Sequence, residues 1–175
     1  LYNDFCKFCG IEKGERPYYV TDLKGYRVIT ISSEGIPNTD QAIISDEQLK
    51  WFEHQEKSRD VLRCTVALQE DSRAIGTIIL SDIDQKNATG HIHIKMARDG
   101  GRGKGYGTDA VNTMVRYAFE ELRLNCIYAN ILAYNEASIR LFERCRFKKD
   151  GVLGQRIYKK GNYIDLLAYS RLIGD

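Results

Sequence analysis

The sequence predicts a mixed α+β fold in which helices flank a central, largely antiparallel sheet. Three short apolar runs, at 61–68, 74–82 and 89–97, follow one another with brief polar turns between them. Consecutive strands with such short links form an antiparallel meander. After these runs, helical patterns alternate with strand patterns, so each helix carries the chain from one strand to the next.

The first part of the chain contributes an extension, a strand and a helix. Residues 1–25 mix turn-forming and charged residues without a clear period, so we expect an extension that is either packed on the domain or partly mobile. Residues 26–175 then form a single domain, which begins with a strand at 27–31. Ser45 opens a Ser-x-x-Gln pattern that resembles a capping box, and apolar residues continue at helical spacing to about residue 55.

The second half alternates helices and strands. Apolar residues at helical spacing predict a helix over 105–122, a β-branched run predicts a strand over 126–133, and a second helix follows over 136–144. The end of the chain predicts three more strands, at 147–153, 156–160 and 163–170. Lys160, Gly161 and Asn162 form the hairpin turn before the last of them.

Composition excludes several classes of partner. The 175 residues carry 26 Lys and Arg against 24 Asp and Glu, so no basic excess favours nucleic acid. No apolar stretch is long enough to span a bilayer, and the N-terminus lacks a secretory signal. We therefore expect a cytoplasmic protein with no membrane partner, and a homodimer remains open.

The cysteines predict neither disulfides nor a metal site. Their number, five, is odd and they are scattered along the chain. Cys6 and Cys9 have a spacing typical of zinc ligands, but no second pair of cysteines or histidines follows at ligand distance. We therefore expect no bound metal.

The run from Arg102 to Gly107 predicts an anion-binding loop. Its glycines allow a tight turn that exposes successive N–H groups, and the following helix directs its positive N-terminal end at the same place. Neither the Walker pattern nor the dinucleotide fingerprint fits this run, and the next strand lacks the ribose-binding acid of a nicotinamide enzyme. The pattern Arg-x-x-Gly-x-Gly does fit. A glycine-rich surface turn is the alternative interpretation.

A second segment, from Asn135 to Phe147, adds a capped helix directly after a strand. The two segments together resemble the GNAT superfamily of N-acetyltransferases, in particular the branch that acetylates ribosomal-protein N-termini, spermidine and amino sugars. The resemblance covers residues 26 to 172 and implies a GNAT-like fold with acetyl-CoA as co-substrate. It implies that these residues bind acetyl-CoA: Met96, Ala97, Arg98, Arg102, Gly103, Lys104, Gly105, Tyr106, Gly107, Thr108, Asn135 and Ser138.

The candidate general base lies on the strand before the glycine loop. His91 and His93 are two residues apart, so they share one face of that strand. Either they face the acceptor site, where the family often carries a carboxylate near position 91, or they are surface histidines. A metal site at this pair is the weaker interpretation, because the sequence shows no third ligand.

The candidate general acid departs from the family pattern. Phe142 stands where the family commonly has a tyrosine that protonates the leaving thiolate, and Arg146 replaces a glycine before Phe147. The resemblance implies transfer of an acetyl group to a primary amine of a protein N-terminus, a polyamine or an amino sugar, by direct attack in a ternary complex. Tyr134, Ser138 or solvent would then supply the proton. The alternative is a non-catalytic module that binds or senses acetyl-CoA.

Overall fold

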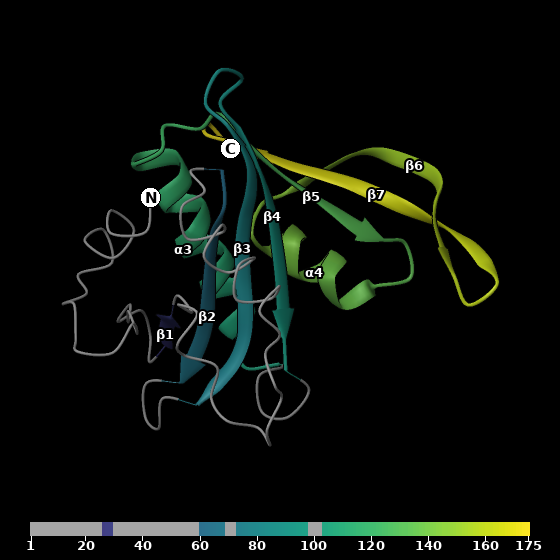
Figure 1. Ribbon diagram of the computed structural model, residues 1–175, viewed down its shortest axis with the longest axis horizontal. Coiled ribbons are helices and arrows are strands. Elements are labelled where there is room, and N and C mark those ends of the chain that lie inside the picture. The colour runs from purple at the N-terminus through teal and green to yellow at the C-terminus, as the bar shows by residue number, and fades with distance from the viewer. Residues whose placement is uncertain (1–25, 30–59, 69–72, 98–102) are drawn as a thin grey trace, which may run out of the picture.

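The computed structural model describes residues 26–29, 60–68, 73–97 and 103–175. Seven strands form one sheet in the order β1-β2-β3-β4-β5-β7-β6 (Figure 1). Every neighbouring pair is antiparallel except β4 and β5, which are parallel. The predicted fold class and the meander at its centre are therefore confirmed. The strands are β1 (Tyr26–Ile29), β2 (Leu62–Leu68), β3 (Ala74–Asp84), β4 (Thr89–Met96), β5 (Cys126–Leu132), β6 (Lys148–Lys159) and β7 (Asn162–Leu172).

Two described helices follow the order that the sequence predicts: α3 (Tyr106–Glu120) lies between β4 and β5, and α4 (Glu136–Arg144) follows β5. In Figure 1, α3 lies behind β2 and β3. The predicted helix at 45–55 and the extension at 1–25 lie outside the described residues. No helix of the described ranges is long and apolar enough to cross a membrane.

The core forms between α3 and one face of the sheet. Val111, Met114 and Ala118 are almost completely buried on α3, and they belong to the same apolar cluster as Ile78 and Ile92 of β3 and β4. Because alternate residues of a strand point to opposite faces, His91 and His93 lie on the other face. The packing of the core thus determines which face of β4 is polar.

One strand prediction is wrong. The sequence predicts separate strands at 147–153 and 156–160, whereas the structure has one strand, β6, over Lys148–Lys159. Its register against β7 shifts between Leu153 and Ile157, and Gln155 has a φ of 51°. The Gln155 N–H donates a hydrogen bond of 2.7 Å to Asp165 Oδ1. A bulge therefore interrupts the pattern of the strand without ending it.

Candidate functional site

The parallel strands β4 and β5 separate towards their C-terminal ends. Their pairing joins residues 89–91 to residues 126–128 and goes no further, although β4 continues to Met96 and β5 to Leu132. We call this separation, bordered by residues 92–96 and 129–132, the β4–β5 fork (Figure 1). Because the strands are parallel, the fork opens where β4 leads towards α3 and β5 leads into α4.

The glycine loop approaches α3 with alternating backbone conformations. Gly103 has a φ of 78° and Gly105 a φ of 86°, whereas Lys104 between them does not have a positive φ. Such alternation turns successive N–H groups towards one side and forms a concave site for anions. A Cβ on either glycine would meet no atom of the described chain within 4 Å, so none of the described residues fills the space beside the loop.

The same loop gives α3 an N-cap residue that has no side chain. Gly105 is the N-cap residue and has no side chain to accept hydrogen bonds from the first turn. Those N–H groups, together with the helix dipole, favour a negative charge at this end of α3. The loop and the helix therefore offer donors to a phosphate from two neighbouring segments.

The end of β4 presents backbone groups to the fork. The N–H of Ala97 donates a hydrogen bond of 2.8 Å to the carbonyl of Ile75, so it is directed towards β3. Because backbone groups alternate in direction along a strand, those of Met96 point to the opposite side, where β5 has separated. Met96 is therefore placed to hydrogen-bond an extended ligand, whereas the amide of Ala97 is already used.

The helix α4 begins beside the fork with the predicted cap. Asn135 Oδ1 accepts a hydrogen bond of 3.3 Å from the backbone N–H of Ser138, so the capping prediction is confirmed. A Cβ on Gly107 would lie 3.5 Å from the side chain of Leu141, which places the first turn of α3 against α4. The glycine loop and α4 are thus held together.

The other end of α4 contains the two departures from the family pattern. Phe142 is 3% exposed, and its ring packs edge-on against Phe147 with 5.0 Å between centroids. Arg146 has a φ of 65°, a conformation that glycine adopts without strain. The turn therefore keeps the left-handed geometry that a glycine would allow, and Phe142 is part of the core.

A β-bulge brings a carboxylate to the two histidines. Ser81 pairs with His91 and Asp84 pairs with Thr89, so two residues of β3 lie opposite Gly90 alone. The extra residue shifts the alternation of side chains, so that Ile83 remains in the core, 6% exposed. Asp82 consequently shares the polar face with Ser81, and it has a φ of 50°. Bulges near functional sites redirect side chains in this way.

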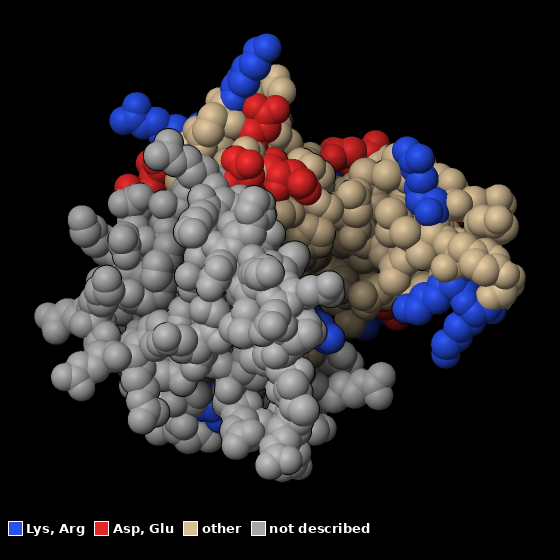
Figure 2. All heavy atoms as spheres, viewed as in Figure 1, with Lys and Arg blue, Asp and Glu red and all other residues tan. Residues whose placement is uncertain are grey.

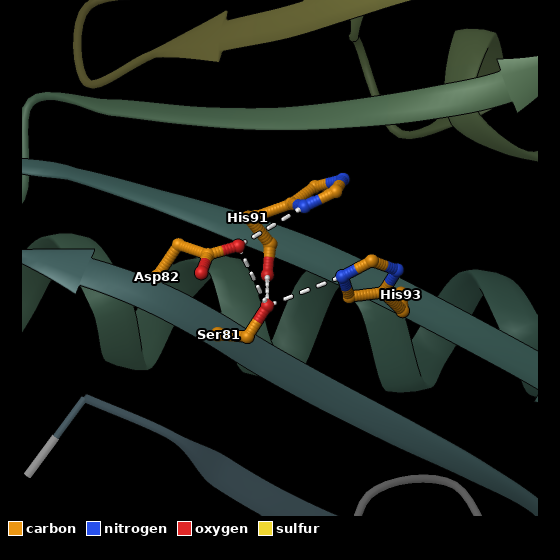
Figure 3. A network of polar contacts seen from close by, with 4 residues as sticks. All are labelled: Ser81, Asp82, His91 and His93. Carbon is orange, nitrogen blue, oxygen red and sulfur yellow. Dashed lines mark hydrogen bonds and ion pairs between the residues drawn. The ribbon is translucent and has the colours of Figure 1, made fainter. Parts of the chain in front are cut away.

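Figure 3 shows the resulting network of Ser81, Asp82, His91 and His93. Asp82 Oδ2 lies 3.4 Å from His91 Nδ1, and Ser81 Oγ lies 3.2 Å from His93 Nε2. The hydroxyl also lies 3.3 Å from Asp82 Oδ2. If Nδ1 of His91 donates its hydrogen to this carboxylate, its Nε2 carries the lone pair, and Nε2 is buried without a partner among the described residues.

The surroundings keep both imidazoles neutral near neutral pH. Burial lowers the pKa of His91, and the carboxylate of Asp82 partly opposes this effect. Burial and the neighbouring His91 lower the pKa of His93. His91 also stacks on Tyr128 of β5, with 4.6 Å between centroids and 10° between the ring planes. The ring of the candidate base is therefore held in one orientation at the base of the fork.

The described residues also provide the third potential metal ligand that the sequence does not reveal. Single donor atoms of Asp82, His91 and His93 lie within 4.8 Å of one another. Two imidazoles and one carboxylate are donors that divalent transition-metal ions accept. The sequence shows no third ligand beside the histidines, but the bulge in β3 supplies one, Asp82.

Comparison with known proteins identifies the family. The sequence model of the family described as "Acetyltransferase (GNAT) domain" matches residues 20–148. The chain belongs to the GNAT acetyltransferase family. Family membership and fold thus agree with the resemblance carried by the glycine loop and by Asn135 and Ser138.

Relatives of this GNAT chain include several named N-acetyltransferases. An uncharacterized N-acetyltransferase of Bacillus subtilis, YokL, is 31% identical over 120 residues, which cover 69% of this chain and 66% of that protein. An uncharacterized N-acetyltransferase of Bacillus licheniformis, p20, is 34% identical over 110 residues, which cover 63% and 61%. The match thus spans slightly less than two thirds of each of these relatives.

Spermidine acetyltransferases are also similar to this GNAT chain. The spermidine N(1)-acetyltransferase of Vibrio cholerae is 26% identical over 129 residues, covering 66% of this chain and 74% of that protein. A solved dodecameric structure of spermidine N-acetyltransferase from the same species is 24% identical, with a TM-score of 0.67 and 73% of each chain covered. The structural likeness supports the GNAT fold.

The structure brings together some of the site residues that the sequence suggests and leaves others apart or undescribed. His91 and His93 meet in one cluster, whereas Tyr134 and Ser138 lie beyond the end of β5 and on α4. Arg98 and Arg102 lie outside the described residues. Sequence reasoning missed Asp82 and Tyr128. The alternation of residues along β3 does not predict the face that Asp82 occupies, because a bulge shifts it. Nothing in the sequence distinguishes Tyr128 from the other residues of β5.

Proposed function

We propose that this GNAT chain transfers the acetyl group of acetyl-CoA to a primary amine, by direct attack in a ternary complex. The observation that carries the proposal is the β4–β5 fork. It opens between the N-terminus of α3, preceded by the glycine loop, and the N-terminus of α4. Ligands of sheets with parallel strands bind at the carboxyl ends of those strands, where such helices begin.

The donor site uses the phosphate-binding side of the fork. The N–H groups that follow Gly103 and Gly105, with the first turn of α3, hold the pyrophosphate of acetyl-CoA. Lys104 and Arg102 add positive charge, and Tyr106, Gly107 and Thr108 supply the helix N–H groups. The pantetheine then extends along the backbone groups of Met96 that point away from β3, and Ala97 and Arg98, which follow Met96 in the sequence, are further proposed contacts.

The acceptor side uses the polar face of β4. His91 is the proposed general base, because Asp82 holds its Nδ1 and stacking on Tyr128 fixes its ring. His93 lies 3.9 Å away, centroid to centroid, and is the second candidate. The amine nitrogen forms a bond to the thioester carbonyl carbon as the base takes its proton. The C–S bond then breaks, and the coenzyme A thiolate leaves.

The proton for the thiolate comes from a group other than Phe142. Lys159 Nζ donates a hydrogen bond of 3.2 Å to the hydroxyl oxygen of Tyr134, which leaves the hydrogen of that hydroxyl available. Ser138 carries a second hydroxyl, near the start of α4, and solvent is the third source. Tyr134 is exposed whereas Ser138 is partly buried, and we therefore favour the hydroxyl of Tyr134 as the proton source.

The proposed acceptor class is supported by the chemistry of the site and by one of the relatives. The relative from Vibrio cholerae is named as a spermidine N(1)-acetyltransferase, and spermidine is a polyamine. We propose for this chain a primary amine of a polyamine, a protein N-terminus or an amino sugar. The exposed rings of Tyr158 and Tyr163 on the β6–β7 hairpin offer an apolar surface, which supports a homodimer as a further proposal.

A screen for coenzyme A release tests this function. Acetyl-CoA is incubated with the full chain and with N-terminal peptides, polyamines or amino sugars, and free thiol and acetylated amine are both measured. We expect equal amounts of the two products with at least one acceptor class. The variant His91→Gln should lower kcat by about 100-fold, since a positioned base typically contributes that much. Tight binding of acetyl-CoA with no thiol release would instead support the sensor module.

A further inference from the structure

Three metal-binding side chains meet on the polar face, from two neighbouring strands. Asp82 comes from β3, and His91 and His93 come from β4, with one donor atom of each within 4.8 Å of the others. Ligand atoms around a tetrahedral Zn²⁺ lie about 3.3 Å apart, given bonds of about 2.0–2.1 Å. The distance of 3.4 Å between Asp82 Oδ2 and His91 Nδ1 already matches one such edge.

The fold holds these donors in place. The bulge in β3 moves Asp82 to the histidine face and keeps it at a φ of 50°, which is strained for a residue other than glycine. His91 is fixed by its stacking on Tyr128, and its side chain is 13% exposed. The hydroxyl of Ser81 contacts both Asp82 and His93. Such outer contacts orient metal ligands and strengthen binding.

We propose that Asp82, His91 and His93 bind a divalent first-row transition-metal ion, with Zn²⁺ as the probe of choice. Three protein ligands leave at least one position of the ion open to water or to another small ligand. Coordination through Nδ1 of His91 places the remaining ring hydrogen on Nε2. The ion therefore removes the lone pair that acetyl transfer would use, so metal and amine acetylation exclude each other.

Calorimetry of the full chain tests the site without any need for turnover. Zn²⁺ is titrated into the parent protein and into Asp82→Asn and His93→Gln. Loss of an outer contact typically weakens metal binding 10- to 100-fold, so loss of a direct ligand should weaken it at least about tenfold. The control Asp150→Asn removes an exposed carboxylate that bonds to Ser170 on another part of the sheet, and it should bind Zn²⁺ like the parent.

Cobalt identifies the donor atoms. Co²⁺ bound by imidazole and carboxylate shows visible absorption bands without the charge-transfer band of a cobalt–thiolate bond. A thiolate band, or loss of binding in a Cys6→Ser and Cys9→Ser variant, would place the ion on those cysteines and overturn the proposal. Unchanged Zn²⁺ affinity in both ligand variants would also overturn it. If Asp82→Asn does not fold, His93→Gln decides the result.

Inhibition is the functional consequence, and it alone rests on the proposed function. Zn²⁺ should abolish thiol release from acetyl-CoA, and a chelator should restore it. The same concentration should inhibit Ser81→Ala about tenfold less effectively, because this variant removes an outer contact of His93 and Asp82 and keeps both candidate bases. Inhibition that is identical in the parent and in Ser81→Ala would contradict the shared site. Calorimetry still tests the metal site if no acceptor is ever acetylated, so failure of one proposal is distinguishable from failure of the other.

Discussion

Replacement of Arg146 by glycine should stabilise the protein. Arg146 follows α4 at the position where the chain turns left-handed, with a φ of 65°. Its N–H donates to the carbonyl of Glu143, and the N–H of Phe147 donates to the carbonyl of Phe142, both at 3.0 Å. This is the pairing of a Schellman motif, and the contact of the two phenyl rings supplies its usual apolar component. Arginine thus occupies the position that favours glycine.

The magnitude follows from two opposing effects. A residue with a Cβ pays about 1–2 kcal/mol in the left-handed region, and Arg146→Gly removes that cost. Glycine loses more chain entropy on folding, which costs about 0.5–1 kcal/mol. The difference of the two effects spans about 0–1.5 kcal/mol, and its middle is a gain of about 0.5–1 kcal/mol in the free energy of unfolding. For a chain of this size, that gain raises the Tm by roughly 1–4 °C.

Thermal unfolding of three proteins measures this gain. Burial lowers the pKa of Arg171, and the charge of Arg146 lowers it further. The variant Arg146→Ala serves as the control, because it removes this charge yet keeps a Cβ in the strained conformation. We expect Arg146→Gly to have the highest Tm of the three. Equal Tm values for the glycine and alanine variants would refute the argument from backbone strain.

Three further predictions concern packing. Gly76→Ala should lower the free energy of unfolding by about 1–3 kcal/mol, because its Cβ would lie 2.6 Å from a backbone oxygen of β4. Gly107→Ala should leave the protein as stable as the parent, because its Cβ would meet its nearest neighbour at 3.5 Å. Urea unfolding compares the two, and equal losses would contradict the prediction. Phe142→Tyr should cost about 1–3 kcal/mol by burying a hydroxyl and should leave kcat unchanged; an increased kcat would show that the ring faces the ligand. Burial raises the pKa of Cys145 from 9.0 to about 11, so at pH 8 its thiolate is roughly 100-fold rarer than in the unfolded chain. Peptide-resolved alkylation should therefore label it slowly until urea is added, and equally fast labelling in the folded protein would contradict this.

The sequence predicts the parts of the fold that depend on periodicity. Apolar residues at helical spacing locate α3, and the short polar turns locate the meander β2-β3-β4. Bulges defeat the same reasoning, because one extra residue changes which side chains share a face. The bulge at Gln155 joins two predicted strands into β6, and the bulge at Asp82 adds a carboxylate to the histidine pair.

The sequence predicts those parts of the candidate site in which a residue type is strongly associated with one backbone conformation or one cap. Gly103 and Gly105 both adopt the left-handed conformations that make glycine the natural choice in this loop, and Asn135 forms its cap. The roles of side chains are harder to predict, because they depend on neighbours far along the chain. His91 and Tyr128 stack across two strands that are paired over only three residues.

The central claim is that acetyl-CoA binds beside the glycine loop at the β4–β5 fork. Calorimetric titration of acetyl-CoA into Gly105→Val and Gly161→Val tests it most directly. Both glycines have a positive φ, of 86° and 83°, and an added Cβ on either would meet no described atom within 4 Å. Gly161, however, lies in the β6–β7 hairpin, a part of the molecule from which basic side chains project (Figure 2). Strain of about 1–2 kcal/mol at the loop corresponds to a loss of affinity of about tenfold. We predict this loss for Gly105→Val and parental affinity for Gly161→Val. Equal affinity in the parent and a folded Gly105→Val would contradict the account.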